Sequence, residues 1–527
     1  MKRVSFVLLL VLLLGVSIIT LDQRSTSVEA QSSGPEMLVP NLGVRTSVTD
    51  LITPISMAHI GANDFLVLEK NTGEVKRVVN GAVQGTVLDL GVNFASERGL
   101  LGIALHPAFP ANPGVYLFWT CRSTTLPTNP FFPDETRCLD SNMFAADTDQ
   151  ILQVPLLGNR VDRFIWTGSS LTFDHNLIML RAFQNDGAPV PPNQGDEEQP
   201  PRGNHDGGVL RFGPDGKLYI LFGDNGRRGQ LQNLPCGPTA NCPGPPQPDD
   251  QFGGPEPDDA HLAGVILRLN PDGTTPTDNP FFSAGAAMNS EAGRNIQKIF
   301  AYGLRNSFGM DFDPISGKLW EEENGDDSFS ELNIAEPGFN SGWVQIMGPP
   351  ERLAQYKAIE TSPDLDPCLN TPYFGLQQLR WPPTLIAGSP SEALARLFVL
   401  PGSHFSAPEF SWKFELAPGA IGFVSGRGLG PQYEGDLFVG GARSILQGGH
   451  LFHFNLTGNR RKIGVDDPRL EDRVADNLCK FDLTESESLL IGRNFGTVTD
   501  IQTGPNGNLF VVSIDTGSVF EIFRRRE

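Results

Sequence analysis

The sequence predicts an all-β protein, a six-bladed β-propeller with long inserted loops. One phrase, a Pro/Gly/Asp turn followed by a short run of alternating aromatic and aliphatic residues, occurs six times. No segment after residue 30 has the period of a long amphipathic helix. The chain has 527 residues, far more than a two-sheet sandwich needs, so a ring of blades explains its length better.

The N-terminal segment 1–30 has the features of a secretory signal peptide. A basic start is followed by an apolar run over 4–19 and by Val28-Glu29-Ala30, a small-x-Ala cleavage signal. An uncleaved anchor helix is the alternative, but the apolar run is short for a bilayer span and no basic cluster stops it. We therefore expect cleavage near Ala30, a secreted or periplasmic protein without stable membrane insertion, and a single propeller domain over 31–527.

The repeated phrase sets the expected order of strands. Each copy is a turn leading into a strand, and several copies continue through Gly or Asp into a second strand. The copies occupy residues 61–70, 106–120, 213–224, 313–326, 430–442 and 504–523. Their irregular spacing predicts long loops, one over 226–260, which is rich in Gly, Pro and Asp, and another within 350–415. Closing the ring is expected to bring early and late strands into one sheet.

Composition excludes some partners without naming one. The formal net charge is −21, which disfavours binding to nucleic acid and to anionic membrane surfaces. Hydrophobic residues make up 39% of the chain, enough for a large core, so disorder throughout is excluded.

The six cysteines are an even set in a chain expected to be exported, which permits disulfides. None has the CxxC spacing of a zinc or redox site. Connectivity stays open from sequence, and the simplest guess closes two short loops and leaves a third pair: Cys121–Cys138, Cys236–Cys242 and Cys368–Cys479.

Four segments combine polar side chains with glycines beside predicted strand ends: 97–102, 204–208 with 223–226, 301–306 and 323–327. Loops of separate blades gather around a propeller's centre, so a His, an Asp and an Arg can meet one ligand there. A His beside a carboxylate is a general base near neutral pH, an Arg holds an anion, and Gly-Asp carbonyls suit Ca²⁺. Turn formation and a solvated acidic edge are the plain alternatives for the same residues. There is no GxSxG or HExxH motif.

Five ordered motifs carry a resemblance to a known family. They occupy residues 97–120, 204–226, 262–282, 301–320 and 331–343, and begin with ERGLLGIALHPAF, NHDGGVLRFGPDG, LAGVILRLNPDG, AYGLRNSFGM and ELNIAEPGF. Together they resemble the soluble pyrroloquinoline-quinone (PQQ)-dependent glucose/sorbosone dehydrogenases, also called aldose sugar dehydrogenases. The resemblance covers most of 50–345 and, more weakly, 417–523. It implies a six-bladed propeller, in agreement with the repeat count.

The resemblance implies a role for four of these residues. His205 matches the base that removes the proton from the sugar's anomeric hydroxyl while hydride passes to the quinone. Asp224 matches the carboxylate that orients this His. Arg305 and Asn306 match the pair that contacts the quinone and stabilises its reduced oxygen.

The resemblance also implies a metal site and a cofactor contact. Gly325 and Asp326 fall where backbone carbonyls bind the Ca²⁺ that anchors PQQ. Glu97 falls where many relatives have Gln, another cofactor contact.

The chain departs from the family pattern where two basic residues grip the PQQ carboxylates. Thr497 and Thr499 occupy these positions. Arg443 falls roughly where relatives have a Lys, and Arg493 lies near in sequence, so both are candidates to compensate. Two lost charge-assisted contacts of ~1.5–3 kcal/mol each would weaken cofactor binding greatly.

The resulting functional prediction is an exported PQQ- and Ca²⁺-dependent oxidoreductase. It would oxidise an aldose or related aldehyde sugar at C1 to a lactone or acid and pass electrons to an external acceptor. Two alternatives stay open: a non-catalytic propeller that binds a ligand and has lost PQQ, and a Ca²⁺-dependent lactonase-like hydrolase.

Overall fold

The structure, a computed structural model, describes residues 34–94, 96–121, 158–181, 204–225, 262–289, 291–362, 364–371, 387–441 and 449–526. From Gly34 onward these residues form one unit. The predicted signal peptide, the loop predicted over 226–260 and Arg443 lie outside the described residues.

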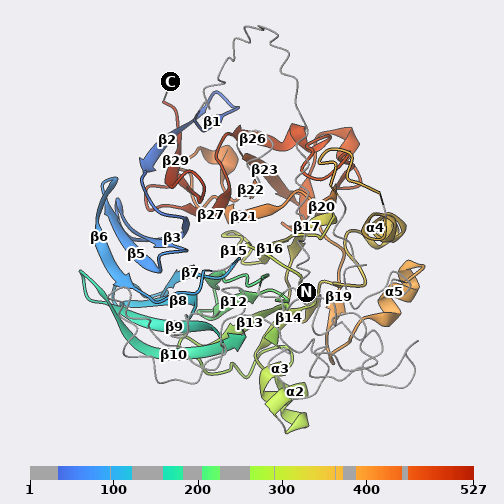
Figure 1. Ribbon diagram of the computed structural model, residues 1–527, viewed down its shortest axis with the longest axis horizontal. Helices are drawn as coiled ribbons and strands as arrows, with labels where there is room; N and C mark the ends of the chain where they lie inside the picture. Colours follow the sequence, from blue (N-terminus) through green and yellow to red (C-terminus); the bar gives the residue numbers. More distant parts are fainter. Residues whose placement is uncertain are drawn as a thin grey trace, which may run out of the picture. The chain divides into compact units, whose positions relative to one another are not determined.

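Strands predominate, and they pair into six sheets in the described part of the chain. Figure 1 shows the sheets arranged around a common centre. The first two sheets have the orders β3-β4-β5-β6 and β7-β8-β9-β10. Their strands are β3 (Pro54–Gly61), β4 (Asp64–Glu69), β5 (Glu74–Val79), β6 (Ala82–Asp89), β7 (Leu100–Leu105), β8 (Gly114–Thr120), β9 (Gly158–Trp166) and β10 (Leu171–Arg181).

The next two sheets have the orders β11-β12-β13-β14-β18-β19 and β15-β16-β17-β20-β25. Parallel pairs attach β18, β19 and β25 to the outer edges. Their strands are β11 (Leu210–Phe212), β12 (Leu218–Phe222), β13 (Val265–Leu269), β14 (Ile299–Tyr302), β18 (Phe339–Asn340), β19 (His404–Phe405), β15 (Gly309–Phe312), β16 (Leu319–Glu323), β17 (Ser328–Ile334), β20 (Phe410–Phe414) and β25 (Val474–Ala475).

The last two sheets have the orders β21-β22-β23-β26-β1, with β24 on β23, and β27-β28-β29-β2. Their strands are β21 (Pro418–Phe423), β22 (Leu437–Gly441), β23 (His450–Thr457), β24 (Lys462–Gly464), β26 (Leu490–Arg493), β1 (Glu36–Met37), β27 (Val498–Thr503), β28 (Leu509–Ser513), β29 (Ser518–Arg524) and β2 (Leu42–Val48). The early strands β1 and β2 therefore pair with late strands, as predicted.

The innermost strands contact one another in the order β3, β7, β11, β15, β21, β27 and back to β3. The predicted all-β class and a propeller-like arrangement are thereby confirmed. Each of the six copies of the repeated phrase supplies the second strand of its sheet, namely β4, β8, β12, β16, β22 and β28. The turn within each phrase reverses the chain after an inner strand, which explains why it recurs.

The core lies between neighbouring sheets. Leu66 of β4 and Leu117 of β8 share one cluster, and Val67 of β4 packs with Val512 of β28 in another. Both faces of a strand such as β4 are therefore buried, and its sequence is a continuous apolar run rather than an alternating one.

The described helices are short and lie in the connections between strands. They are α2 (Phe282–Met288), α3 (Glu291–Ile296), η4 (Pro350–Arg352), α4 (Leu353–Glu360), α5 (Pro390–Arg396), η7 (Pro431–Tyr433), η8 (Pro468–Leu470) and η9 (Ser486–Leu489). The segment 350–415, predicted as an inserted loop, contains the helices η4, α4 and α5 and the strands β19 and β20 among its described residues, so it is not an irregular loop throughout. Among the described residues no helix is long and apolar enough to cross a membrane.

Disulfide pairing was guessed from spacing, and one pair is confirmed. Cys368 and Cys479 are bonded, with 5.9 Å between their Cα atoms. Cys121 is also disulfide-bonded. Cys138 and the pair Cys236–Cys242 lie outside the described residues.

Candidate functional site

Most of the predicted site residues that the structure describes lie in loops on the same side of the ring. In an antiparallel pair, the start of the inner strand lies beside the end of the second strand. His205 precedes β11 and Arg305 precedes β15, whereas Asp224 follows β12 and Asp326 follows β16. The hairpin topology therefore gathers residues that are up to about 120 positions apart in the sequence.

His205 and Asp224 form a buried pair. Nδ1 of His205 lies 2.6 Å from Oδ1 of Asp224, and the two residues are 5% and 0% exposed. Burial acts to raise the pKa of Asp224, but the interaction with His205 outweighs it and the pKa is lowered. Trp343 Nε1 donates to the other carboxylate oxygen at 2.9 Å. The ring of His205 is thus fixed through Nδ1, which leaves Nε2 for a ligand.

Gly223 permits this arrangement. A Cβ atom at Gly223 would lie 2.2 Å from the carbonyl oxygen of His205 and 2.9 Å from that of Arg305. The amide of Asp224 donates to the same Arg305 oxygen at 2.9 Å. A side chain at Gly223 would therefore separate the two loops that carry the predicted base and the predicted cation.

Arg305 and Asn306 lie next to this pair. Arg305 donates to Oδ1 of Asp326 at 2.5 Å and to the carbonyl of Asn324 at 2.9 Å. Burial favours the neutral guanidinium, yet Asp326 and Asp224 raise the pKa of Arg305 above its ordinary value. Nε of Arg305 and Oδ1 of Asn306 are buried and have no hydrogen-bond partner among the described residues.

Glu97 connects the third loop to the same cluster. Its Oε2 accepts from the amide of His205 at 2.6 Å and from Nδ2 of Asn306 at 3.2 Å. His205 has a φ of 62°, in the left-handed region that a residue with a side chain enters at a cost. The Glu97 contact is one of those that hold this backbone in place.

The predicted Ca²⁺ ligands Gly325 and Asp326 lie in the turn between β16 and β17. Lys480 donates to the carbonyl of Asp326 at 3.0 Å and to Oδ1 of Asp327 at 2.9 Å. A carbonyl oxygen has two lone pairs, so it can accept from Lys480 and bind a cation at the same time. The donor set is made of oxygens and fits a hard ion such as Ca²⁺, although Lys480 already supplies a positive charge beside it.

The acidic stretch 321–327, at the end of β16 and in the turn after it, is buried, so the alternative of a solvated edge is wrong. Burial, opposed by a hydrogen bond from Ser341, raises the pKa of Glu323 to about 7. Burial and the charge of Glu323 raise the pKa of Glu331 to about 8. Burial, with Asp327 and then Asp326, raises that of Glu360 to about 8. These carboxyl groups, with Lys480 and Trp343, surround the site. Glu323, Glu331 and Trp343 lie in segments that the sequence singled out, whereas Glu360 and Lys480 were not predicted as part of the site.

Arg493 does not join the cluster. It lies on β26, which pairs with the edge strand β1, and its half-exposed side chain forms an ion pair with Glu36 at 2.5 Å. Thr497 directly precedes β27 and donates from its hydroxyl to Asp515 at 3.2 Å. Thr499 points its Oγ1 into a buried position where the described residues offer no partner.

Two cavities lie near the centre of the ring. A cavity of about 200 Å³, which we call the Glu97 cavity, lies on the side of the predicted site. Its walls include Lys70, Glu97, Gly207, Thr497 and Thr499.

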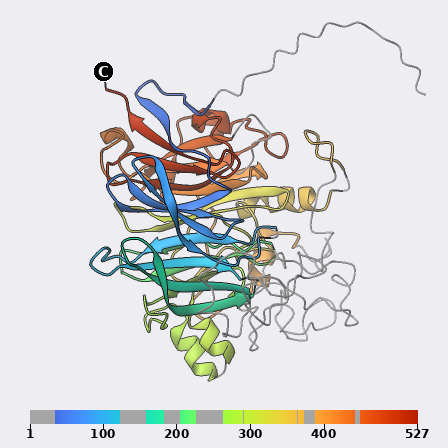
Figure 2. The same ribbon diagram turned by 60° about the vertical axis from the view of Figure 1, so that its left-hand side comes forward.

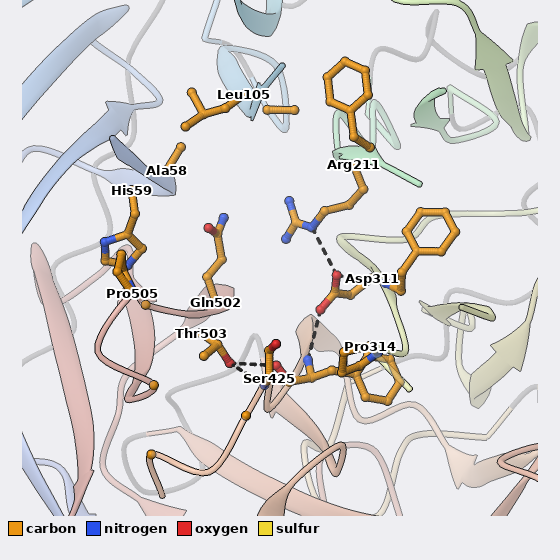
Figure 3. A pocket seen from close by; sticks show the side chains of 18 of the residues that line it. Ala58, His59, Leu105, Arg211, Asp311, Pro314, Ser425, Gln502, Thr503 and Pro505 are labelled. Atoms are coloured by element: carbon orange, nitrogen blue, oxygen red, sulfur yellow. Dashed lines mark hydrogen bonds and ion pairs between the residues drawn. The ribbon is translucent and has the colours of Figure 1, made fainter. Parts of the chain in front are cut away.

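The larger cavity, of about 870 Å³, lies at the opposite ends of the inner strands (Figure 3). It is lined by residues such as His59, Leu105 and Phe212, and it holds none of the predicted site residues. Arg211 lines both cavities and pairs with Asp500 at 2.8 Å, so this ion pair separates them. His205, Asp224 and Arg305 are not among the residues that line the smaller cavity, but Glu97 lines it and bonds to His205 and Asn306, so this cavity adjoins the candidate active site.

The fold and this cluster define an all-β, propeller-like protein with a buried His–Asp pair and an Arg at one end of its sheets. The model of the glucose/sorbosone dehydrogenase family matches residues 51–130 and 247–367. The resemblance to the PQQ-dependent sugar dehydrogenases found in the sequence is therefore confirmed.

Curated relatives carry names that agree with this family. Quinoprotein glucose dehydrogenase B of Acinetobacter calcoaceticus is 28% identical over 351 residues, which are 64% of this chain and 59% of the relative. Aldose sugar dehydrogenase of Escherichia coli is 24% identical over 311 residues, or 59% of this chain and 57% of the relative. The chain thus spans less than two thirds of the length of each.

Solved structures share the fold. The soluble aldose sugar dehydrogenase of Escherichia coli, in its apo form, has a TM-score of 0.55 at 20% identity and covers 92% of this chain and 100% of its own. The PQQ-bound aldose sugar dehydrogenase of Streptomyces coelicolor has a TM-score of 0.51 at 19% identity and covers 92% and 98%. At such identities the likeness establishes the fold alone.

Proposed function

We propose that the protein is a PQQ- and Ca²⁺-dependent oxidoreductase of the glucose/sorbosone dehydrogenase family that oxidises an aldose or related aldehyde sugar at C1. The observation that carries the proposal is the 2.6 Å pair of His205 and Asp224 with Arg305 beside it. A buried His held by a carboxylate suits proton abstraction, and a buried Arg suits charge that develops on a neighbouring acceptor.

The residues present fit PQQ. Nε of Arg305 and Oδ1 of Asn306 are both otherwise unpartnered in the described chain. A carbonyl oxygen of the cofactor can accept a hydrogen bond from Nε of Arg305, and a ring N–H can donate one to Oδ1 of Asn306. When bound, PQQ would supply an acceptor for the two electrons of the sugar's C1–H bond. Arg305 and Asn306 would hold it, and Glu97, which bonds to Asn306, would lie beside it.

In this proposal His205 acts at Nε2 on the anomeric hydroxyl of the sugar. The O–H bond breaks and its proton goes to Nε2, while Nδ1 stays hydrogen-bonded to Asp224. Asp224 stabilises the imidazolium that forms, and Trp343 keeps the carboxylate in position by its hydrogen bond. A cyclic sugar that loses this proton and the C1 hydrogen is a lactone.

Several finer features belong to the same proposal. We propose that the six sheets are the blades of a six-bladed propeller, which the closed order of contacts between inner strands supports. We further propose Ca²⁺ at the carbonyls of Gly325 and Asp326, an external electron acceptor, and export after cleavage near Ala30 that leaves a single domain over 31–527. The oxygen-rich turn and the sequence of residues 1–30 support these points.

The test is to load the purified full-length protein with PQQ and Ca²⁺ and measure sugar-dependent reduction of a dye across a panel of aldoses. Activity with at least one aldose, lost in His205→Ala, is the expected result. No activity together with no PQQ-induced thermal shift would favour the binding-module alternative. Lactone hydrolysis without PQQ would favour the hydrolase.

A further inference from the structure

Lys70 places a positive charge in the wall of the Glu97 cavity. It directly follows β4, and its ammonium donates to the carbonyl of Ser96 at 3.0 Å and to Oδ1 of Asn71 at 3.3 Å. The carbonyl of Phe94 lies farther away, at 3.5 Å. Every acceptor is a neutral oxygen, and within the described ranges no carboxylate lies within ion-pair distance of Lys70. Its charge is therefore not neutralised by a direct partner.

The other cation of this cavity is already neutralised. Arg211 lines the Glu97 cavity too, but its guanidinium donates to Asp500 at 2.8 Å and lies 3.8 Å from Asp311. Asp500 also accepts from Ser56 at 2.7 Å. An anion entering the cavity would have to compete with these carboxylates for Arg211, whereas it would displace only neutral oxygens from Lys70.

The cavity wall also contains a polar atom without a partner. Oγ1 of Thr499 is buried, and no described group bonds to it. Thr497 and Thr499 stand where the family resemblance expects two basic residues. Thr499 offers a hydroxyl donor and Lys70 an ammonium, and both line this cavity, which suits an anionic ligand.

We propose that Lys70 supplies the positive charge for the PQQ carboxylates that the two threonines no longer supply. This inference rests on the proposed function and names a residue that the family motifs do not. Glu97 lines the same cavity, and its carboxylate would repel a tricarboxylate. Lys70 offsets this repulsion on the same side of the cavity.

A purely structural role for Lys70 is the competing explanation. By bonding the carbonyls of Phe94 and Ser96, Lys70 could simply hold the loop that leads to Glu97. Such a role would affect every ligand of the site equally. A role in gripping carboxylates would affect only ligands that carry them, so a charged and an uncharged form of one ligand separate the two.

The experiment measures equilibrium binding of PQQ and of its trimethyl ester to the full-length protein in Ca²⁺, by quenching of tryptophan fluorescence. Lys70→Gln is compared with Lys76→Gln, which removes a lysine that pairs with Glu74 on β5. We expect Lys70→Gln to weaken PQQ binding by about tenfold to a hundredfold and to leave ester binding within about twofold. Lys76→Gln should bind both as the wild type does. The double variant Lys70→Gln with Thr499→Lys should bind PQQ at least about tenfold more tightly than Lys70→Gln alone.

Two results would overturn the inference alone. One is wild-type affinity for PQQ in Lys70→Gln, and the other is an equal loss for PQQ and ester. A wild-type protein that binds neither PQQ nor the ester would overturn the proposed function, and the inference with it.

Discussion

Asp224 and Trp343 are joined by a 2.9 Å hydrogen bond although 119 positions separate them in the chain. Trp343 also lies under the guanidinium of Arg305, with 5.5 Å between the cation and the ring centroid. One indole therefore contacts both the carboxylate that orients His205 and the cation beside it. The site is held together by a residue that has no acid–base chemistry of its own.

Replacing Asp224 by Asn should abolish most catalysis. Asn keeps the shape of the side chain but loses the charge that stabilises a protonated His205. We expect kcat for aldose oxidation by the PQQ-loaded protein to fall by about 10²–10⁴. The measurement is steady-state dye reduction at saturating sugar.

Trp343→Phe is the matched control, because it keeps the Asp224 charge and a ring under Arg305 while losing the N–H donor. Its kcat should fall by less than about tenfold, in line with the loss of one hydrogen bond of ~1 kcal/mol. Equal losses in the two variants would contradict the role assigned to Asp224. PQQ affinity should stay close to wild type in both.

PQQ affinity should fall as the pH rises through about 8. Burial lowers the pKa of Lys70 to about 8, although Asp206 and Glu97 raise it and Arg98 lowers it further. Below this pH the ammonium is charged and can bind a carboxylate, whereas above it the neutral amine cannot. Binding isotherms between pH 6.5 and 9.5 should show this loss.

Lys70→Arg is the control for this titration, since a guanidinium stays charged over the whole range. Its PQQ affinity should be flat where that of the wild type declines. A decline of equal size in both proteins would mean that another group titrates.

Much of the fold could be predicted because its signal is local. The turn and the second strand of each sheet are adjacent in sequence, so β4, β8, β12, β16, β22 and β28 were visible as repeats. Short inner strands such as β11 carry too few residues to stand out. The helix α4 lacks a clear apolar stripe and falls in a segment expected to be a loop.

The site could be predicted only where its residues lie in motifs. His205 and Asp224 are 19 positions apart and flank one repeat, so the hairpin brings them together. Lys480 reaches the carbonyl of Asp326 from 154 positions away, and nothing near Lys480 in the sequence announces it. The stretch 321–323 is three consecutive glutamates, a pattern typical of solvated residues, and only tertiary partners explain its burial.

His59 should make the protein less stable in acid. Burial lowers the pKa of His59 to about 4, against the opposing effect of Asp500 and Glu521. Phe65 and Phe510 pack edge-on against its ring, with 5.5 Å and 4.6 Å between the ring centroids. The unfolded chain takes up a proton near pH 6.5 and the folded chain does not, so stability falls as pH drops from 6.5 to 4.

His59→Gln should remove this contribution, which is no more than about 3 kcal/mol at pH 4. The measurement is the difference in unfolding free energy between variant and wild type at each pH. The unfolding free energy of the variant should rise relative to that of the wild type as the pH falls. A pH-independent difference for His59→Gln would contradict the assignment.

Lys480→Met should destabilise the fold more than any loss of a surface lysine. The Lys480 side chain is 7% exposed, and its ammonium lies 2.9 Å from Asp327 and 3.1 Å from Glu415. Burial would lower its pKa, but these two carboxylates raise it above the ordinary value, so the charge is present in the folded protein. Methionine fills a similar volume and leaves the buried Asp327 and the partly exposed Glu415 without this cation.

We therefore expect Lys480→Met to reduce the free energy of unfolding by about 3–5 kcal/mol, measured by denaturant titration at pH 7. Lys462→Met, at an exposed position on β24, should change it by no more than about 0.5 kcal/mol. A gap below about 1 kcal/mol at pH 7 would mean that the two carboxylates find other partners, and that Lys480 does not hold the turn that carries Asp326.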